Sequence, residues 1–229
     1  MAAAPSSRSQ GKKIVVFGAT GRTGRPLVEQ ALEQGYYVTA VVRCPGKLDI
    51  QHPNLQIVQG DICDIESYAT SFKDKDAILS AFGSPYHSIF NPTTMYSESM
   101  KGIMEAMKRH KVSRLIVVTS WGTCPGPNNH WFMEWFLKPF ILNGIIKDMA
   151  VMEKMVEESD PSEINYTFVR PAGLTDDPPN DNYKVEEGYC NTNTTMSIPR
   201  ADVAAFMLEC LNSSEYDRKG MAIASLRDK

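Results

Sequence analysis

Short apolar runs alternate with longer amphipathic stretches from residue 12 to the end of the chain. The apolar runs are rich in β-branched residues and predict strands at residues 14–18, 38–42, 55–58, 77–82, 115–119, 166–169 and 221–224. Stretches with helical spacing predict helices at residues 26–33, 65–72, 92–110, 148–159 and 200–211. This alternation predicts an α/β fold of Rossmann type, with a doubly wound, mostly parallel sheet and helices on both of its faces.

The chain has 229 residues, which is enough for one domain. Residues 1–11 are small and polar without periodicity, so we expect a disordered tail followed by a single domain over residues 12–229. The formal net charge of -3 argues against a nucleic-acid-binding protein, which usually carries a basic face.

The five cysteines are scattered and form no C-x-x-C pair, so the sequence predicts neither a disulfide framework nor a zinc site. Reduced thiols are typical of a cytoplasmic protein, and no signal peptide is recognisable. The four histidines lack the spacing of metal ligands, so no metal site is expected.

The most hydrophobic segment, residues 130–149, is interrupted by Glu134, Lys138 and Pro139 and is therefore not expected to span a membrane. It is expected either to cover the core as a helix broken at Pro139 or to form the wall of a pocket or a subunit interface. Trp131 and Trp135 suit the wall of a pocket.

Three glycines, Gly18, Gly21 and Gly24, lie between the first predicted strand and the first predicted helix. Glycine permits a sharp turn and lets the backbone approach a phosphate closely, and the helix N-terminus favours an anion. Thr20, Arg22 and Thr23 add donor groups to the same turn. The first βα turn of an alternating chain is the context that this motif requires, so the pattern predicts a dinucleotide-binding site.

The end of the second predicted strand suggests which dinucleotide binds. Arg43 stands about 20 residues after the glycines, where NAD-binding proteins usually carry an acid for the ribose hydroxyls. Arginine is a good partner for a 2′-phosphate, and Lys47 in the next turn adds a second cation. The sequence therefore favours NADP(H), with a solvated arginine at a strand end as the alternative.

Asp61 ends the third predicted strand, at the edge of the sheet where ligands bind in such folds. It either accepts a hydrogen bond from the adenine amino group, with Ile62 packed on the ring, or caps the helical segment that follows. Gly83 ends the fourth strand, where it would let the backbone pass close to the ribose.

Several motifs resemble the atypical short-chain dehydrogenase/reductase family, and most closely its biliverdin-IXβ reductase and flavin reductase type and its NmrA-like dinucleotide sensors. They are FGATGRTG, the VVR strand end, QGD, NPTTMYSESMKGIMEAMKRHKVSRLIVVTS, YTFVRPAGLTD and RADVAAFMLECL. The resemblance covers roughly residues 12–225 and is weakest at residues 125–146.

The resemblance implies roles for the matching positions. Gly18, Thr20, Gly21, Arg22, Thr23 and Gly24 would hold the pyrophosphate, Arg43 and Lys47 the 2′-phosphate, Asp61 and Ile62 the adenine, and Phe82 and Gly83 the ribose. Thr119 and Ser120 would lie near the nicotinamide, with Pro171, Gly173 and Leu174 closing its other side. Trp121, Trp131 and Trp135 would line the substrate pocket, and the substrate-side elements would fall within about residues 121–146 and 171–199.

Two departures from the family pattern bear on the chemistry. No tyrosine occurs between Ser120 and Asp160, so the Tyr-x-x-x-Lys acid of many short-chain reductases is missing. Gly173 stands where the family's biliverdin reductases carry a histidine. Ser120 is the one candidate catalytic side chain, unless its hydroxyl only binds the backbone. Asp148 and Glu153 are five residues apart, so we do not expect them to share a helix face as an acid pair.

Two classes of function follow. In the first, the protein is an NADPH-dependent oxidoreductase that reduces a flat conjugated acceptor such as a flavin or a linear tetrapyrrole, with FMN or FAD as substrate rather than bound cofactor. In the second, it is a sensor that binds NADP(H) without turnover. Reduction of small carbonyls or quinones is a minor third alternative. The expected partner is a small molecule, with no nucleic acid or membrane, and the expected state is a monomer or weak homodimer.

Overall fold

The computed structural model describes residues 11–83, 93–123, 143–189 and 193–227. Ten strands are described: β1 (Lys13–Phe17), β2 (Tyr37–Val42), β3 (Leu55–Gln59), β4 (Ala77–Ser80), β5 (Arg114–Val118), β6 (Asn165–Pro171), β7 (Gly173–Thr175), β8 (Tyr183–Glu187), β9 (Ser197–Pro199) and β10 (Lys219–Ser225). Four α-helices are described: α1 (Gly24–Glu33), α2 (Met95–His110), α3 (Asn143–Glu157) and α4 (Arg200–Glu209). Short 3-10 segments include η1 (Pro45–Lys47), η2 (Ile65–Ser67), η3 (Ala69–Phe72) and η4 (Trp121–Thr123).

Eight strands form one sheet in the order β3-β2-β1-β4-β5-β6-β10-β8. All neighbouring strands in it are parallel except β8, which pairs antiparallel with β10 at one edge. Strands β7 and β9 form a separate parallel pair. The strand order reverses between β1 and β4, and in doubly wound sheets ligands bind beyond the carboxyl ends of the strands at such a point.

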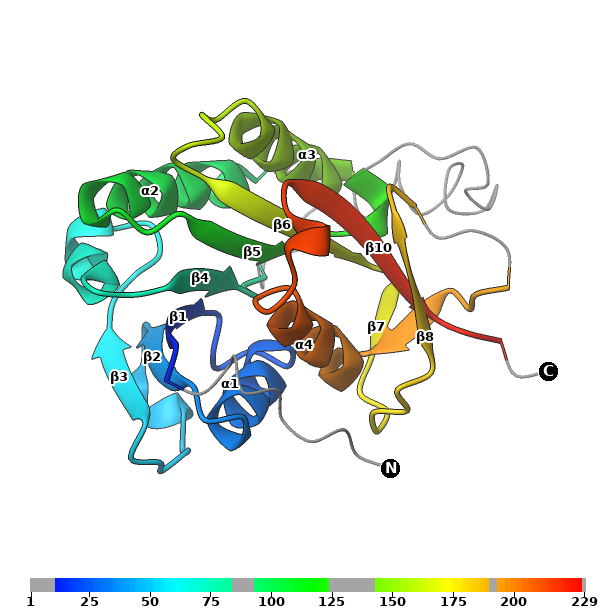
Figure 1. Cartoon of the computed structure of the whole chain (residues 1–229), viewed down its shortest axis with the longest axis horizontal. Coiled ribbons are helices and arrows are strands. Elements are labelled where there is room, and N and C mark those ends of the chain that lie inside the picture. Colours follow the sequence, from blue (N-terminus) through cyan, green and yellow to red (C-terminus); the bar gives the residue numbers. More distant parts are fainter. Residues whose placement is uncertain (1–10, 84–92, 124–142, 190–192, 228–229) are drawn as a thin grey trace.

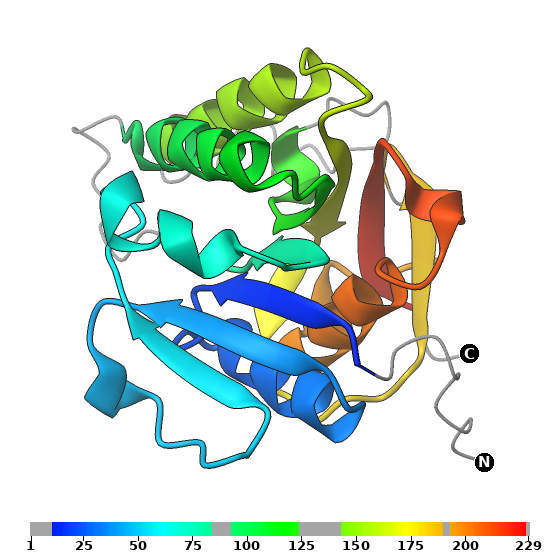
Figure 2. The same ribbon diagram turned by 60° about the vertical axis from the view of Figure 1, so that its left-hand side comes forward.

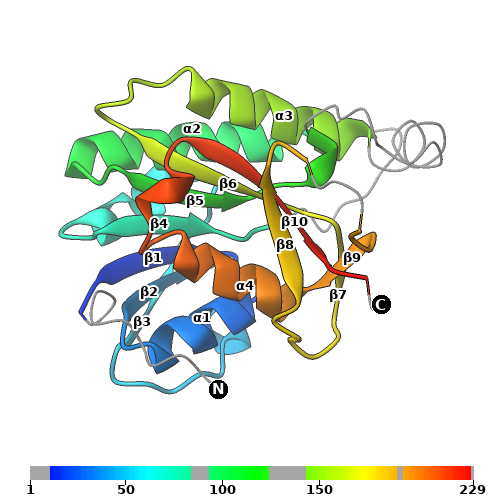
Figure 3. The same ribbon diagram turned by 45° about the vertical axis from the view of Figure 1, so that its right-hand side comes forward.

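Helices cover both faces of the sheet, with α2 and α3 on one side and α1 and α4 on the other (Figures 1, 2 and 3). Successive residues of β1 point to opposite faces, so Val15 packs in the core beneath α2 and α3 while Val16 packs in the core beneath α1 and α4. The predicted apolar face of α2 is observed, because Met100, Ile103 and Met107 are fully buried.

The predicted fold class is confirmed, and each predicted strand occurs within a few residues of its expected bounds. The helical segment predicted at residues 65–72 is present as the two consecutive 3-10 segments η2 and η3 rather than as one helix. No pattern in the sequence predicted β7, β8 or β9. Strand β8 is an edge strand with the polar sequence YKVEE, and β7 and β9 have three residues each, so none of the three carries an apolar run.

Candidate functional site

A cleft of about 310 Å³ opens at the carboxyl ends of β1 to β4, where the strand order reverses. The glycine turn contributes Gly18, Thr20 and Gly21 to its lining. The other predicted site residues that line it are Arg43, Asp61, Ile62, Phe82 and Gly83, and the sequence analysis did not anticipate Val41, Val42, Gly60, Cys63, Ala81 or Met95. Residues from four strand ends therefore meet as predicted, and Met95 at the start of α2 also lines the cleft.

The glycine turn is shaped so that only glycine fits at two of its positions. Gly18 has a φ of +78°, and a Cβ there would lie 2.6 Å from the backbone nitrogen of Phe82. A Cβ on Gly24 would collide with the carbonyl oxygen of Gly18. The turn is also closed by a hydrogen bond of 2.8 Å that the Gly21 N–H donates to this same carbonyl. Helix α1 thus starts directly against the turn and leaves a side-chain-free cradle that fits a pyrophosphate.

Three polar residues of the glycine turn differ in where their side chains lie. Thr20 is exposed and lines the cleft, whereas Thr23 is buried. The Arg22 guanidinium is exposed and forms an ion pair of 3.0 Å with Asp176, just past β7. Asp176 also binds Arg200 of α4 at 2.7 Å. Arg22 therefore connects the turn to the β7–β9 side of the molecule, and it is not among the residues lining the cleft.

The predicted 2′-phosphate ligands lie at the end of β2. Arg43 is exposed and lines the cleft, while Lys47 is exposed in η1 and lies outside the lining. The side chain of Asp61 also reaches the cleft, where its Oδ1 accepts a hydrogen bond of 3.0 Å from the Cys63 N–H. The residue that caps η2 is Asp64, so the alternative of Asp61 as a helix cap is wrong.

Phe82, beyond the end of β4, packs its ring on Tyr96 of α2, with ring centroids 5.2 Å apart and planes nearly parallel. The carboxylate of Asp148 on α3 holds the start of α2 in turn, because it accepts hydrogen bonds from the Tyr96 N–H (2.8 Å) and the Ser97 hydroxyl (2.5 Å). A buried acid therefore occupies the N-terminus of α2, and this helix end is not available to an anionic ligand.

Ser120 follows β5 and is half-buried. Its Oγ accepts a hydrogen bond of 3.3 Å from the Gly122 N–H, so the backbone contact considered as its alternative role is present. Trp121, also half-buried, begins η4. Thr119 is buried, and its hydroxyl donates to Glu153 on α3 rather than lining the cleft.

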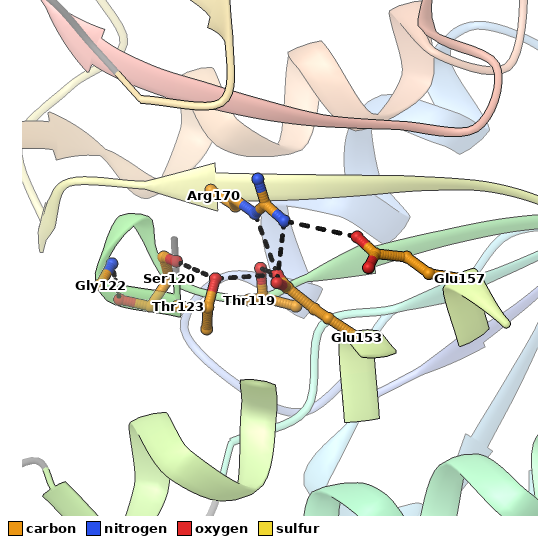
Figure 4. A network of polar contacts seen from close by, with 7 residues as sticks. All are labelled: Thr119, Ser120, Gly122, Thr123, Glu153, Glu157 and Arg170. Carbon is orange, nitrogen blue, oxygen red and sulfur yellow. Dashed lines mark hydrogen bonds and ion pairs between the residues drawn. The ribbon is translucent and has the colours of Figure 1, made fainter. Parts of the chain in front are cut away.

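Glu153 is the centre of a polar network that the sequence analysis missed (Figure 4). Its carboxylate accepts hydrogen bonds from Thr119 Oγ1 (2.6 Å), Thr123 Oγ1 (3.0 Å) and Arg170 Nε (3.1 Å) through Oε1, and from Arg170 Nη2 (2.9 Å) through Oε2. Asp148 and Glu153 form no acid pair, as expected, but each is buried on its own set of partners. A clue was present in the sequence, since an arginine within the apolar run YTFVRP needs a buried anion.

The chain matches a known protein family over most of its length. A model described as NAD(P)H-binding matches residues 18–214, which includes the whole glycine turn and the ends of β2, β3 and β4. The chain belongs to the NAD(P)H-binding family. The predicted NAD(P)H cofactor and the resemblance to atypical short-chain reductases are thus confirmed at the level of the family.

This NAD(P)H-binding protein is also similar to one curated relative and, in fold, to solved structures. The chain is 33% identical over 224 residues to an uncharacterized chloroplastic protein of Arabidopsis thaliana, covering 93% of this chain and 77% of the relative. It is similar in fold to ChuY, an anaerobilin reductase from Escherichia coli O157:H7, with a TM-score of 0.76, 21% identity and coverage of 95% and 99% of the two chains. A proposed NADH-flavin reductase from Streptococcus pneumoniae has a TM-score of 0.73, 23% identity and coverage of 94% and 100%.

The predicted residues after β6 lie on the β7 side of this NAD(P)H-binding protein. Pro171 is buried at the end of β6, and Gly173 and Leu174 belong to β7. The Gly173 N–H donates to the carbonyl of Met196, and a Cβ on Gly173 would lie 2.9 Å from that oxygen. The pairing of β7 with β9 thus gives a steric reason for glycine at the position where the family's biliverdin reductases carry histidine.

Trp131 and Trp135, predicted to line the substrate pocket, lie outside the described residues. Among the residues that the structure describes, no group of three or more His, Cys, Asp and Glu side chains is arranged to hold a metal ion. Over the same part of the chain, no helix is both long and apolar enough to cross a bilayer. The cytoplasmic location expected from the sequence stays a prediction.

Proposed function

We propose that the protein is an NADPH-dependent reductase that delivers a hydride to a flat conjugated acceptor, a flavin or a linear tetrapyrrole. The observation that carries the proposal is the cleft itself, in which the glycine cradle and the exposed Arg43 line one continuous cavity. The cradle fits a pyrophosphate, and Arg43 at the end of β2 suits a 2′-phosphate better than the two hydroxyls of NADH.

The side chains near Ser120 favour an acceptor that does not need a protein acid. The tyrosine of the Tyr-x-x-x-Lys motif is absent, and the two buried acids of α3 are already engaged, Asp148 at the start of α2 and Glu153 with Arg170. A ketone needs a positioned proton donor as its alkoxide forms. A flavin takes the hydride at a ring nitrogen and its proton from water, so its reduction needs no acidic side chain of the protein.

The nicotinamide, when bound, supplies the hydride, and the chain's own residues bind and orient the two rings. Gly18, Gly21 and Thr20 would hold the pyrophosphate, while Asp61 and Ile62 would contact the adenine. Ser120, just after β5, would orient the carboxamide through a hydrogen bond or relay a proton from water to the acceptor. The substrate is proposed to be a small molecule, and the protein to act as a monomer or weak homodimer without a nucleic-acid or membrane partner.

The names of two structural neighbours guide the choice of acceptors. One is described as an anaerobilin reductase and the other as a proposed NADH-flavin reductase, and at 21% and 23% identity both show only a shared fold. They support offering a linear tetrapyrrole and a flavin first.

Steady-state oxidation of NADPH by the purified protein tests the proposal, with FMN, riboflavin and biliverdin offered in turn and NADH as the comparison donor. We expect turnover with at least one flavin and a preference for NADPH. Tight NADPH binding without turnover on any of the three acceptors would contradict the reductase and support an NADP(H)-binding sensor instead.

A further inference from the structure

The turn that carries Ser120 is held by two threonine hydroxyls. Thr123 donates its hydroxyl to the Ser120 carbonyl (2.8 Å) and also lies 3.0 Å from Glu153 Oε1. The Thr123 N–H donates to the same Ser120 carbonyl at 3.0 Å. Thr119, directly before Ser120, donates its hydroxyl to Glu153. Ser120 is thus bracketed by two residues that both contact one carboxylate (Figure 4).

That carboxylate has little freedom to move. Glu153 is 4% exposed and Arg170 is 7% exposed, and the pair is joined at both carboxylate oxygens. Glycine at position 220 of β10 makes room for the guanidinium, since a Cβ there would collide with it. Arg170 also lies over the ring of Phe168, 5.9 Å from its centroid. Arg170 therefore fixes Glu153 from the sheet side.

The described hydrogen bonds to Glu153 are all donated by its partners. A carboxylate only accepts hydrogen bonds, and each of its contacts in the network is a donor, namely two hydroxyls and a guanidinium. Buried charge-assisted hydrogen bonds of this kind are short and directional. The single Thr123 hydroxyl proton faces both the Ser120 carbonyl, at 2.8 Å, and Glu153 Oε1, at 3.0 Å, so Thr123 links the carboxylate to the turn.

The turn also packs on α3 through apolar contacts. A Cβ on Gly122 would lie 2.9 Å from Cδ1 of Ile146, so the turn is in close contact with the helix that carries Glu153. The Gly122 N–H in turn donates to Ser120 Oγ. The direction of the Ser120 hydroxyl therefore depends on the turn, and the turn depends on α3.

We propose that Glu153, clamped by Arg170, is a positioning residue of the reductase site: through Thr119 and Thr123 it fixes the turn that aims the Ser120 hydroxyl. The proposal rests on the proposed reductase function for its catalytic consequence. It makes no claim on the substrate or on cofactor affinity, because Glu153 and Arg170 do not line the cofactor cleft.

Three variants test the positioning role. Thr123→Val removes the hydroxyl but keeps the shape of the side chain and leaves the buried ion pair intact. Glu153→Gln keeps the shape of the side chain but sets an amide group against the Arg170 donors. Glu157→Gln is the matched control, since Glu157 lies one turn further along α3 and 3.9 Å from the same guanidinium, but is half-exposed.

Two readouts are measured on each variant: hydrogen exchange of the Thr123 and β1 amides, and steady-state kinetics with the NADPH dissociation constant. In Thr123→Val and Glu153→Gln we expect the Thr123 amide to exchange at least about tenfold faster, as for the loss of one or two hydrogen bonds. We expect kcat to fall about 10- to 100-fold, with the NADPH dissociation constant unchanged. Glu157→Gln should behave like the wild type.

The exchange readout needs no acceptor, so it separates this inference from the proposed function. Unchanged exchange at Thr123 in Thr123→Val would overturn the positioning role whatever the activity. Faster exchange in β1 as well as at Thr123 in that variant would mean general destabilisation, and would also overturn it. If the wild type is active and kcat is unchanged in Thr123→Val and Glu153→Gln although the Thr123 amide exchanges faster, the link between the turn and Ser120 is refuted. If the wild type turns over no acceptor, the reductase proposal fails, while unchanged exchange at the Thr123 amide in Glu153→Gln would still show that Glu153 does not fix the turn.

Discussion

Arg170 on β6 and Glu153 on α3 form a buried two-point ion pair, with nitrogen–oxygen distances of 3.1 and 2.9 Å. The pair joins the sheet to the helix next to the end of β5. Removing one partner would leave the other charge buried and uncompensated.

We therefore expect Arg170→Met to lower the free energy of unfolding by roughly 3–5 kcal/mol. The matched control is Arg22→Met, which removes an arginine from an exposed ion pair with Asp176 and should cost less than about 1 kcal/mol. Urea unfolding of both variants measures the difference. Equal losses would show that the Glu153–Arg170 pair contributes no more than a surface ion pair.

The contact between Gly24 and the Gly18 carbonyl predicts a steric effect on cofactor binding. In Gly24→Ala, the new methyl group would push α1 away from the turn, and we expect NADPH binding to be lost together with some stability. Gly46→Ala is the control, because a Cβ on Gly46 in η1 meets no atom within 4 Å. Calorimetric titration with NADPH distinguishes the two. Normal affinity in Gly24→Ala would contradict the close packing of helix and turn.

Arg43 at the end of β2 predicts the choice of cofactor. Reversing its charge in Arg43→Glu should weaken NADPH binding about 10- to 100-fold, the loss of a charge-assisted contact, with little effect on NADH. Lys154→Glu, an equal charge change at an exposed site on α3, should affect neither cofactor. Dissociation constants for both cofactors provide the measurement. If the affinities for NADPH and NADH fall alike, Arg43 is not the 2′-phosphate ligand.

Ser120 is the side chain expected to act in the chemical step. Ser120→Ala removes a hydroxyl that accepts a hydrogen bond from the Gly122 N–H, and it should lower kcat about 10- to 100-fold. NADPH binding should stay nearly unchanged, because Ser120 does not line the cofactor cleft. Turnover that is unchanged in this variant would leave Ser120 with its backbone role only.

Tyr183 on β8 predicts how stability responds to alkaline pH. Burial, with a smaller contribution from Glu209, raises the pKa of its phenol to about 12 from an ordinary 10.0. Between these two values the unfolded chain loses this proton while the folded chain keeps it, so unfolding becomes easier as pH rises. The contribution of Tyr183 is fully present below pH 10.0 and is lost by about 12.

In Tyr183→Phe, the free energy of unfolding should therefore fall less steeply with pH over this alkaline range than in the wild type. Below pH 9, roughly one unit under the ordinary pKa, the two proteins should show the same slope. Urea unfolding at a series of pH values gives both slopes. Identical slopes above pH 10.0 would show that Tyr183 ionises as readily in the folded protein as in the unfolded chain.

The residues whose positions were predicted correctly from the sequence are those that a local pattern of neighbouring residues places. Gly18 and Gly24 stand between an apolar run and a helix, and this arrangement alone implies a tight turn at the edge of a sheet. Arg43 and Asp61 come at the ends of apolar runs. Because the strands β1, β2 and β3 are parallel, both residues lie at the carboxyl edge of the sheet. Each of these inferences needed only the order of neighbouring elements.

The residues that the sequence missed depend on contacts between distant segments. Glu153 and Arg170 are 17 residues apart and meet because β6 lies beneath α3, and the room for the guanidinium comes from Gly220 on β10. Met95 lines the cleft at the start of α2, where Asp148 of α3 accepts a hydrogen bond from the neighbouring Tyr96 N–H. Periodicity places a residue on a face of its own element, but it does not identify the residue that faces it.

In the proposed reaction, bound NADPH transfers its hydride directly to a conjugated acceptor. Anaerobic mixing of the protein with NADPH and, in turn, FMN, riboflavin or biliverdin, followed by bleaching of the acceptor, tests this most directly when it is repeated with NADPH deuterated at the transferred position. We predict bleaching that is slower with the deuterated cofactor and slower again in Ser120→Ala. An NADPH complex that leaves FMN, riboflavin and biliverdin all unreduced would contradict the claim.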